Sequence, residues 1–258
     1  MIDVQPAFSQ RLVRKGALIE ETYRAFAHWD LRKSLPENID MIRAQNTLGA
    51  PNESWLREIT VTLSSRFSHG DSVAPLAILA KGQYPLERWR YCLLWHFAST
   101  DHLYAQFAAE FLFDQHQHGI AAFDTNAVLP FIERLDAEKA FEAPLSHYGR
   151  VRTARDLLRM AAAFGLVEGQ PVRRFTNSPI PEDAILYALY DLMDRVQSVS
   201  RSIPDARWRL FLMKSSDVEH ELINLHQFRR LRYEQAGSVR ELSLPHANLT
   251  EFARSLTA

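Results

Sequence analysis

The stretch that decides the fold is Arg150–Phe175, which reads RVRTARDLLRMAAAFGLVEGQPVRRF. Apolar residues recur at helical spacing in its first part, and Gly165 then supplies the residue type that most readily adopts the left-handed conformation at a helix end. Two short segments, 166–167 and 172–175, flank a turn at 168–170. A helix followed by a hairpin is the order of a winged helix-turn-helix, in which one helix enters a DNA major groove and the hairpin lies beside it on the phosphates.

Positive charge is concentrated in this stretch. It contains six arginines, one aspartate and one glutamate, whereas the whole chain has a formal net charge of −1. Such a basic cluster predicts contact with nucleic-acid phosphates, even inside a chain that is close to neutral overall. The expected DNA contacts are Arg150, Arg152, Arg155 and Arg159 on the helix and Arg173 and Arg174 on the hairpin. The alternative is that these arginines pair with carboxylates such as those of Asp156 and Glu168.

The N-terminal segment carries a second, smaller group of basic residues. Residues 1–15 show no apolar face, so we expect a short extended arm that contacts phosphates through Arg11, Arg14 and Lys15. Deleting such an arm should weaken DNA binding without lowering the melting temperature, because the arm buries nothing. An alternative ligand for these side chains is RNA, bound by the helical N-terminal part of the chain as in antitermination factors.

Length and composition allow one large domain or two modest ones. The chain has 258 residues, of which 47% are hydrophobic, and this is ample for a packed core. We predict a helical bundle domain at 1–122 and a winged-helix-like domain at 123–258. The predicted fold class is therefore mainly α: a helical N-terminal domain followed by a C-terminal domain with winged helix-turn-helix character and two short β-hairpins.

The first predicted domain contains several sequence patterns that are typical of helices and of their N-terminal caps. Ser34 and Glu37 form an S-x-x-E capping box, and Asn52 is placed to cap the following helix. These two helices, joined at Gly49, are a possible helix-turn-helix, although an ordinary αα-hairpin is the commoner arrangement. Further helices rich in aromatic residues are expected at 86–98 and 101–117, and they predict the core of an all-α bundle.

The second domain repeats the order of helix and hairpin. Strand-like segments at 231–233 and 239–242 flank a turn that contains Gly237. Trp208 and Phe211 are expected to be core residues that hold this part of the chain to the helix at 182–196. Other helices are expected at 128–135, 137–141 and 249–256, and a further one runs to about 227 from a second capping box, Ser216-x-x-Glu219.

The sequence offers no recognisable catalytic or metal-binding motif. Its nine glycines are too scattered for a phosphate-binding loop, and no serine, cysteine or carboxylate lies in a nucleophile motif. His220 and Glu221 resemble the start of a zinc-binding H-E-x-x-H helix, but Asn224 occupies the position of the second histidine. We therefore expect a protein that is not an enzyme and that uses no metal, cofactor or small-molecule substrate.

The single cysteine and the hydropathy pattern bear on the compartment. Cys92 lies in an apolar run, so we expect a buried thiol, and one cysteine allows no disulfide within the chain. The N-terminus has no apolar signal-peptide region, and no apolar run approaches the ~18 residues of a membrane span. These features predict a soluble, cytoplasmic protein with no membrane contact.

Four short motifs, spread over almost the whole chain, carry a family resemblance. They are GALIEET at 16–22, GLVEG at 165–169, WRLFL at 208–212 and AGSV at 236–239. Together they resemble the BrxA family, small accessory proteins of BREX bacteriophage-defence systems. The resemblance implies a non-catalytic, largely helical protein with winged-helix character that binds double-stranded DNA and works beside a methyltransferase, an ATPase and other defence proteins. The alternative hypothesis is that the protein is a protein-interaction scaffold, because winged helices often serve as docking modules and the net charge is not basic.

Overall fold

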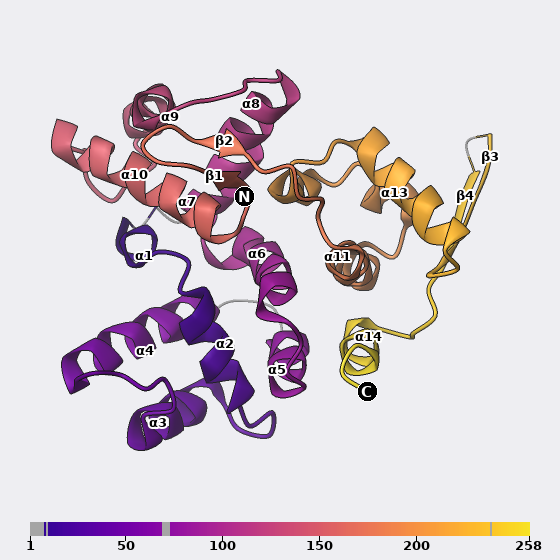
Figure 1. The fold of residues 1–258 in the computed structure, drawn as a ribbon, viewed down its shortest axis with the longest axis horizontal. Coiled ribbons are helices and arrows are strands. Elements are labelled where there is room, and N and C mark those ends of the chain that lie inside the picture. The colour runs from indigo at the N-terminus through magenta and orange to yellow at the C-terminus, as the bar shows by residue number, and fades with distance from the viewer. Residues whose placement is uncertain (1–7, 9, 69–72, 238) are drawn as a thin grey trace, which may run out of the picture.

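Helices dominate the structure, a computed structural model that describes residues 8, 10–68, 73–237 and 239–258. The only strands in this part of the chain form two short antiparallel hairpins (Figure 1). The predicted fold class, mainly α with two short hairpins, is therefore confirmed.

The first half of the chain is a series of helices whose starts follow the capping signals. Ser34 and Glu37 form the predicted capping box, in which the Ser34 amide donates to the Glu37 carboxylate (2.7 Å), and Asn52 accepts from the Trp55 amide (2.9 Å). The elements are α1 (Gln10–Lys15), α2 (Ile19–Ala27), α3 (Leu35–Gln45), α4 (Glu53–Phe67), α5 (Ala74–Lys81), α6 (Leu86–Thr100), α7 (His102–Gln106), a π-helical segment (Phe107–Leu112) and α8 (Phe113–Gln117).

The prediction of an extended arm at residues 1–15 is wrong for residues 10–15. Residues 10–15 form α1, and Val13 within it is only 1% exposed. Just before this helix, Phe8 packs its ring against that of Phe141 (6.0 Å between centroids) and its amide donates to the Ala140 carbonyl (2.7 Å). Two apolar side chains therefore anchor a segment that is too short to show a periodic pattern. Residues 1–7 and 9, also part of the predicted arm, lie outside the described residues.

The second half of the chain contains the two hairpins. Its elements are α9 (Thr125–Ala137), α10 (His147–Ala163), β1 (Val167–Glu168), β2 (Arg174–Phe175), α11 (Glu182–Val196), α12 (Val199–Ser202), a 3₁₀ helix (Ala206–Phe211), α13 (Ser215–Gln227), β3 (Arg232–Ala236), β4 (Val239–Ser243) and α14 (Leu249–Ser255). The short helix predicted at 137–141 is wrong, because α9 itself runs to Ala137 and Phe141 forms an isolated bridge with Phe8.

The unit of α10 and the first hairpin forms as the opening stretch predicts. Gly165 follows α10 with a positive φ of 77°, and β1 then pairs with β2 through Val167 and Phe175. The connection between the strands is longer than the expected three-residue turn. At its tip Gly169 has a φ of 87°, and a Cβ there would lie 2.6 Å from the Val172 carbonyl oxygen, so the tight course of the turn requires glycine.

The turn of the first hairpin is held against the chain that leads into α9. Phe123 and Arg173 exchange both backbone hydrogen bonds, at 3.0 and 2.7 Å. The hairpin is thus fixed beside α10, and α9 packs along α10 as well. This arrangement determines which side of α10 faces solvent.

Side chains from both predicted domains share one core. Trp95 of α6 packs against Trp208 (5.3 Å between ring centroids), and its indole nitrogen donates to Asp191 of α11 (2.8 Å). Trp208 and Phe211 are 1% and 3% exposed, which confirms that they are core residues. Helix α14 packs between α11 and α5, so late and early parts of the chain meet. The division at residue 122 stays a prediction.

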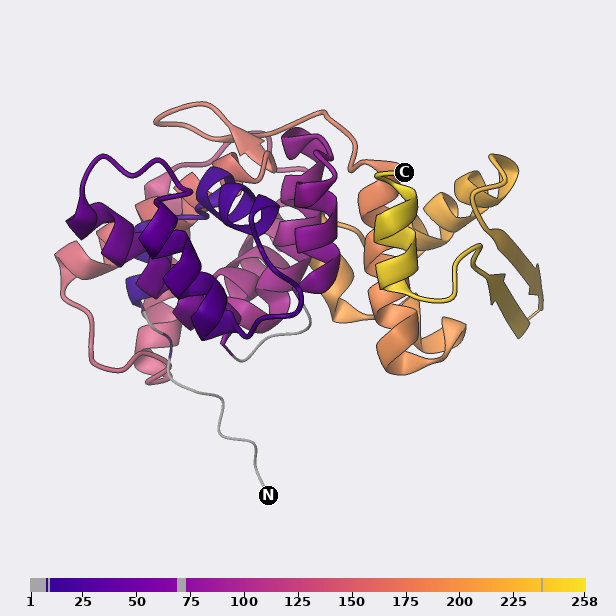
Figure 2. The same ribbon diagram turned by 90° about the horizontal axis from the view of Figure 1, so that it is seen from below.

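The second hairpin lies far from α1 and α10. Strands β3 and β4 pair over five residues each and project beyond the helices at one end of the protein (Figure 2). Helix α10 and the N-terminal helices lie toward the other end (Figures 1 and 2).

Candidate nucleic-acid interface

Helix α10 has an N-terminal cap and an exposed row of arginines, as its sequence pattern predicts. Ser146 caps it by accepting a hydrogen bond from the Gly149 amide (3.1 Å). Apolar side chains at the i, i+3, i+4 spacing face the core, whereas Arg152, Arg155 and Arg159 recur three and four positions apart and lie exposed on the opposite side. The helix therefore presents a row of guanidinium groups to solvent.

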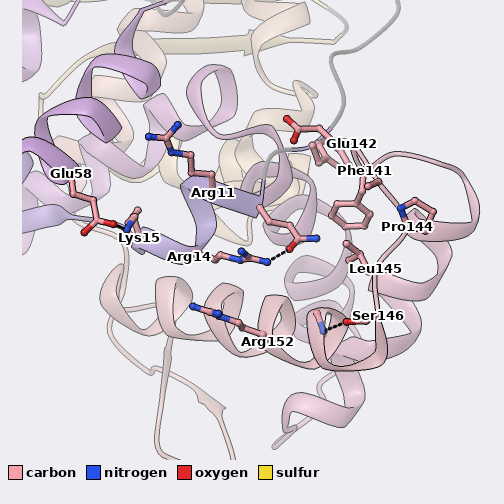
Figure 3. A pocket seen from close by; sticks show the side chains of 14 residues that line it. Arg11, Arg14, Lys15, Glu58, Phe141, Glu142, Pro144, Leu145, Ser146 and Arg152 are labelled. Carbon is pink, nitrogen blue, oxygen red and sulfur yellow. Dashed lines mark hydrogen bonds and ion pairs between the residues drawn. The ribbon is translucent and has the colours of Figure 1, made fainter.

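Helix α1 lies beside this row. Figure 3 shows Arg11, Arg14 and Lys15 of α1 and Arg152 of α10 around one groove, which the connection at 141–146 closes at the side. We call this hollow, with a volume of about 700 Å³, the α1–α10 groove. Two basic groups that are far apart in the sequence thus meet on one surface.

The α1–α10 groove holds four basic side chains and two acidic ones. Lys15 forms an ion pair with Glu58 of α4, and Arg14 donates to Gln10 within α1 (2.6 Å). The second acidic residue, Glu142, lies in the connection between α9 and α10. The groove retains an excess of positive charge after these contacts.

Arg159 connects α1 to α10. Its guanidinium donates to the carbonyl oxygen of Arg14 (3.0 Å) and pairs with Asp156 one turn earlier on α10 (3.1 Å). Buried Arg66 holds the next residues by donating to the carbonyl oxygens of Gly16 (3.0 Å) and Ala17 (3.1 Å). The last turn of α1 is therefore fixed to its neighbours, and Arg159 keeps half of its side chain exposed.

Asp156 is the acidic group within the basic row. Burial raises the pKa of its carboxyl above the ordinary value, against the opposing effect of nearby Arg159, Arg152 and Arg14. One carboxylate oxygen, Oδ2, is buried without a hydrogen-bond partner in the described part of the chain. A second hollow, of about 640 Å³, opens here between α10 and the hairpin turn, and Arg155, Arg159 and Asp156 line it.

Arg150 lies on the other side of α10. Its guanidinium is 2.9 Å from the carboxylate of Asp136 and 3.8 Å from that of Glu133, both on α9. Arg150 thus joins α9 to α10. For this residue the structure matches the alternative interpretation, in which the arginines pair with carboxylates. Arginines near the second hairpin are paired as well: Arg230 with Asp183, Arg232 with Glu234 and Arg240 with Glu219.

The two arginines of the first hairpin differ in exposure. Arg173 is only 8% exposed and donates to the carbonyl of Gly169 inside the turn, and burial lowers the pKa of its guanidinium. Arg174 is exposed, and no hydrogen bond or ion pair joins its side chain to another residue that the structure describes. Of the two predicted hairpin contacts, Arg174 is the one presented to solvent.

Tyr148, which sequence reasoning missed, stands at the start of α10. Its side chain is 69% exposed, unusually high for an aromatic residue. The signal that points to it is the helical spacing, since Tyr148 lies four positions before Arg152 on the same side of the helix.

The described residues show neither a metal cluster nor a membrane span. No three histidine, cysteine, aspartate or glutamate side chains among them are placed to hold a metal ion. None of the helices in the described ranges is long and apolar enough to cross a membrane.

The fold and this surface define a mainly helical protein with an exposed basic helix next to a short hairpin. The family model of BrxA matches residues 6–190, and the chain belongs to this family of BREX phage-defence proteins. Comparisons with curated proteins and with solved structures gave no match. The matched range includes α1, α10 and the first hairpin and ends within α11.

Proposed function

We propose that this chain is a non-catalytic accessory protein of a BREX-type defence system that binds double-stranded DNA. The observation that carries the proposal is the meeting of α1 and the exposed side of α10 on one basic surface. Arg152 and Arg155 have no carboxylate within ion-pair distance among the described residues. Phosphate groups are a ligand class that suits such closely spaced guanidinium groups.

The arrangement around α10 supports a duplex as the ligand. Helix-turn-helix proteins place one helix in the major groove, and neighbouring elements contact the phosphates on either side. Here α1 borders α10 from Gly149 to Arg159, and the hairpin turn borders its C-terminal half on another side. In a complex, α1 and Arg174 contact the two flanking backbones, and α10 lies between them. Other proteins of the defence system are the expected partners.

A protein-interaction role has its own support at the other end of the chain. Phe228, which follows α13, is 70% exposed, and Ile223 on α13 is 44% exposed. Exposed apolar side chains are suited to a protein partner. This surface is remote from α1 and α10, so both functions are compatible.

The test compares nucleic acids and then removes charge from the proposed surface. Binding to matched duplex DNA, single-stranded DNA and RNA is measured at several salt concentrations, and we expect the duplex to bind tightest. Arg152→Ala with Arg155→Ala should make the slope of log K against log salt shallower by about 1.8, because each neutralised B-DNA phosphate contributes about 0.9.

The matched control removes the same charge elsewhere. Arg32 and Arg232 are 90% and 69% exposed and pair with Asp30 and Glu234, far from α10 in the chain. Their double alanine variant should keep the wild-type slope and affinity. Tighter binding to RNA than to the duplex would contradict the proposal in favour of RNA binding. Equal slopes for the two double variants would contradict it in favour of the protein-interaction role.

A further inference from the structure

Tyr148 continues the row of exposed arginines on α10. Tyr148, Arg152, Arg155 and Arg159 occupy positions i, i+4, i+7 and i+11, and all four are exposed. This spacing places them in one stripe along the helix. With a rise of 1.5 Å per residue, the stripe is about 16 Å long, which is comparable to about five stacked base pairs at 3.4 Å each.

Packing does not account for the aromatic side chain at the head of the stripe. Tyr148 is 69% exposed, and its hydroxyl makes no hydrogen bond to any residue in the described part of the chain. Its neighbours Ser146, Gly149 and Arg152 line the α1–α10 groove. An aromatic side chain with no hydrogen-bond partner among the described residues therefore lies at the edge of the basic surface.

We propose that Tyr148 is a specificity-determining residue that packs its ring on the 5-methyl group of a thymine in the major groove. The inference rests on the proposed duplex binding. Residues near the start of a recognition helix contact base edges, whereas phosphate contacts carry no direct sequence information. The thymine methyl is the apolar group that base pairs display in the major groove, and it matches the apolar face of a tyrosine ring.

The positions of the charged side chains indicate which residues contact the DNA backbone and which contact a base. Arg11 and Arg14 of α1 lie to the side of the stripe, where the backbone of a duplex centred on α10 passes. Tyr148 has no charge to offer a phosphate. Its removal should therefore alter discrimination between bases and leave the salt dependence unchanged.

The experiment uses a mixed-sequence duplex and the same duplex with every thymine replaced by deoxyuridine. Wild-type protein should bind the thymine duplex about four-fold tighter, the effect of burying one methyl group. Tyr148→Ala should bind both duplexes equally, with the wild-type slope of log K against log salt. Tyr148→Phe keeps the ring and should retain the four-fold preference.

The controls separate the outcomes. Phe228→Ala removes an equally exposed aromatic ring far from α10 and should keep the preference for thymine. An identical preference in wild type and Tyr148→Ala would overturn the inference, as would a shallower salt slope in Tyr148→Ala, which would make the tyrosine a backbone contact. If wild-type protein binds neither duplex, the proposed DNA binding fails as well, and the inference fails with it.

Discussion

Arg150 and Arg152 are two positions apart on α10, and they face opposite sides of it. Arg150 joins α9 through Asp136, and Arg152 lines the α1–α10 groove. Charge alone does not distinguish them in the sequence. Their positions around the helix distinguish them, because each residue adds about 100° of rotation about the helix axis and the apolar side chains mark the buried side. The exposure of these arginines was therefore predictable, but the identity of their partners was not, because Asp136 comes from another helix.

Asp156→Asn should strengthen duplex binding at neutral pH. The change removes a negative charge beside Arg14, Arg152 and Arg159 and keeps an oxygen that accepts from Arg159. Because burial raises the pKa of the Asp156 carboxyl, lowering the pH should neutralise it above the ordinary carboxyl range. The affinity difference between variant and wild type should then shrink as the pH falls, in binding assays at fixed salt.

The same shift has a consequence for stability. A carboxyl whose folded-state pKa is raised contributes stability that is fully present below the unfolded-state pKa and is lost as the pH rises through the folded-state value. The free energy of unfolding of wild type should therefore fall relative to Asp156→Asn as the pH rises through that window. Parallel stability curves for the two proteins would contradict the assignment.

The two hairpin arginines give a matched pair of variants. Arg174→Ala removes an exposed charge, so it should leave the melting temperature unchanged and make the salt slope of DNA binding shallower by about 0.9. Arg173→Ala removes a buried donor that binds the Gly169 carbonyl, so it should lower stability by about 1–3 kcal/mol. Thermal melts and salt titrations of both variants test this, and the reverse assignment of effects would show that Arg173 faces the ligand.

Helix α1 could not be predicted from its local sequence. Its few apolar side chains lie within a short basic segment, and no periodicity emerges from six residues. The residues that hold this segment come from distant parts of the chain: Phe141 packs on Phe8 just before α1, and Arg159 donates to the Arg14 carbonyl. By contrast, α10 and the first hairpin were predicted, because a long periodic helix and a glycine at its end are local signals.

Deleting residues 1–15 should lower the melting temperature, contrary to the expectation for a mobile arm. The deletion removes buried Val13 and Phe8 together with the basic residues of α1. Arg11→Ala with Arg14→Ala is the matched control, because it keeps both apolar anchors. The double variant should retain the wild-type melting temperature and lose about 1.8 of the salt slope. If the deletion leaves the melting temperature unchanged, α1 contributes nothing to the folded state.

Individual core residues such as Trp208 were predicted, but the arrangement of the core was not. Trp208 was recognised as buried because a large aromatic in an apolar segment has few other uses in a helical protein. The contact of Trp208 with Trp95 was not predicted, because contacts between elements that are distant in sequence leave no periodic pattern. The same limit applies to the α1–α10 groove, whose two sides were both singled out but were not expected to meet.

Trp208→Ala should destabilise the chain by about 3–5 kcal/mol, because it leaves a cavity against Trp95 and Phe211 and removes the donor to the Ser202 carbonyl (2.7 Å). The free energy of unfolding from denaturant titration measures the effect. Phe228→Ala is the exposed control and should change stability by less than about 0.5 kcal/mol. A stable Trp208→Ala variant would show that α6 and the 3₁₀ helix are held together by other contacts.

The packing of α14 on α5 has a consequence for how the chain folds during synthesis. Gly82, at the end of α5, lies so close to Thr257 that a Cβ there would be 2.3 Å from the threonine side chain, so this approach is tight. Helix α5 leaves the ribosome long before α14 is made. The apolar surface of α5 that α14 covers therefore stays uncovered until then. Contacts of such long sequence separation form late, and surfaces that await them are the ones that chaperones bind. Helix α5 thus emerges early but reaches its final packing only after α14 has been translated.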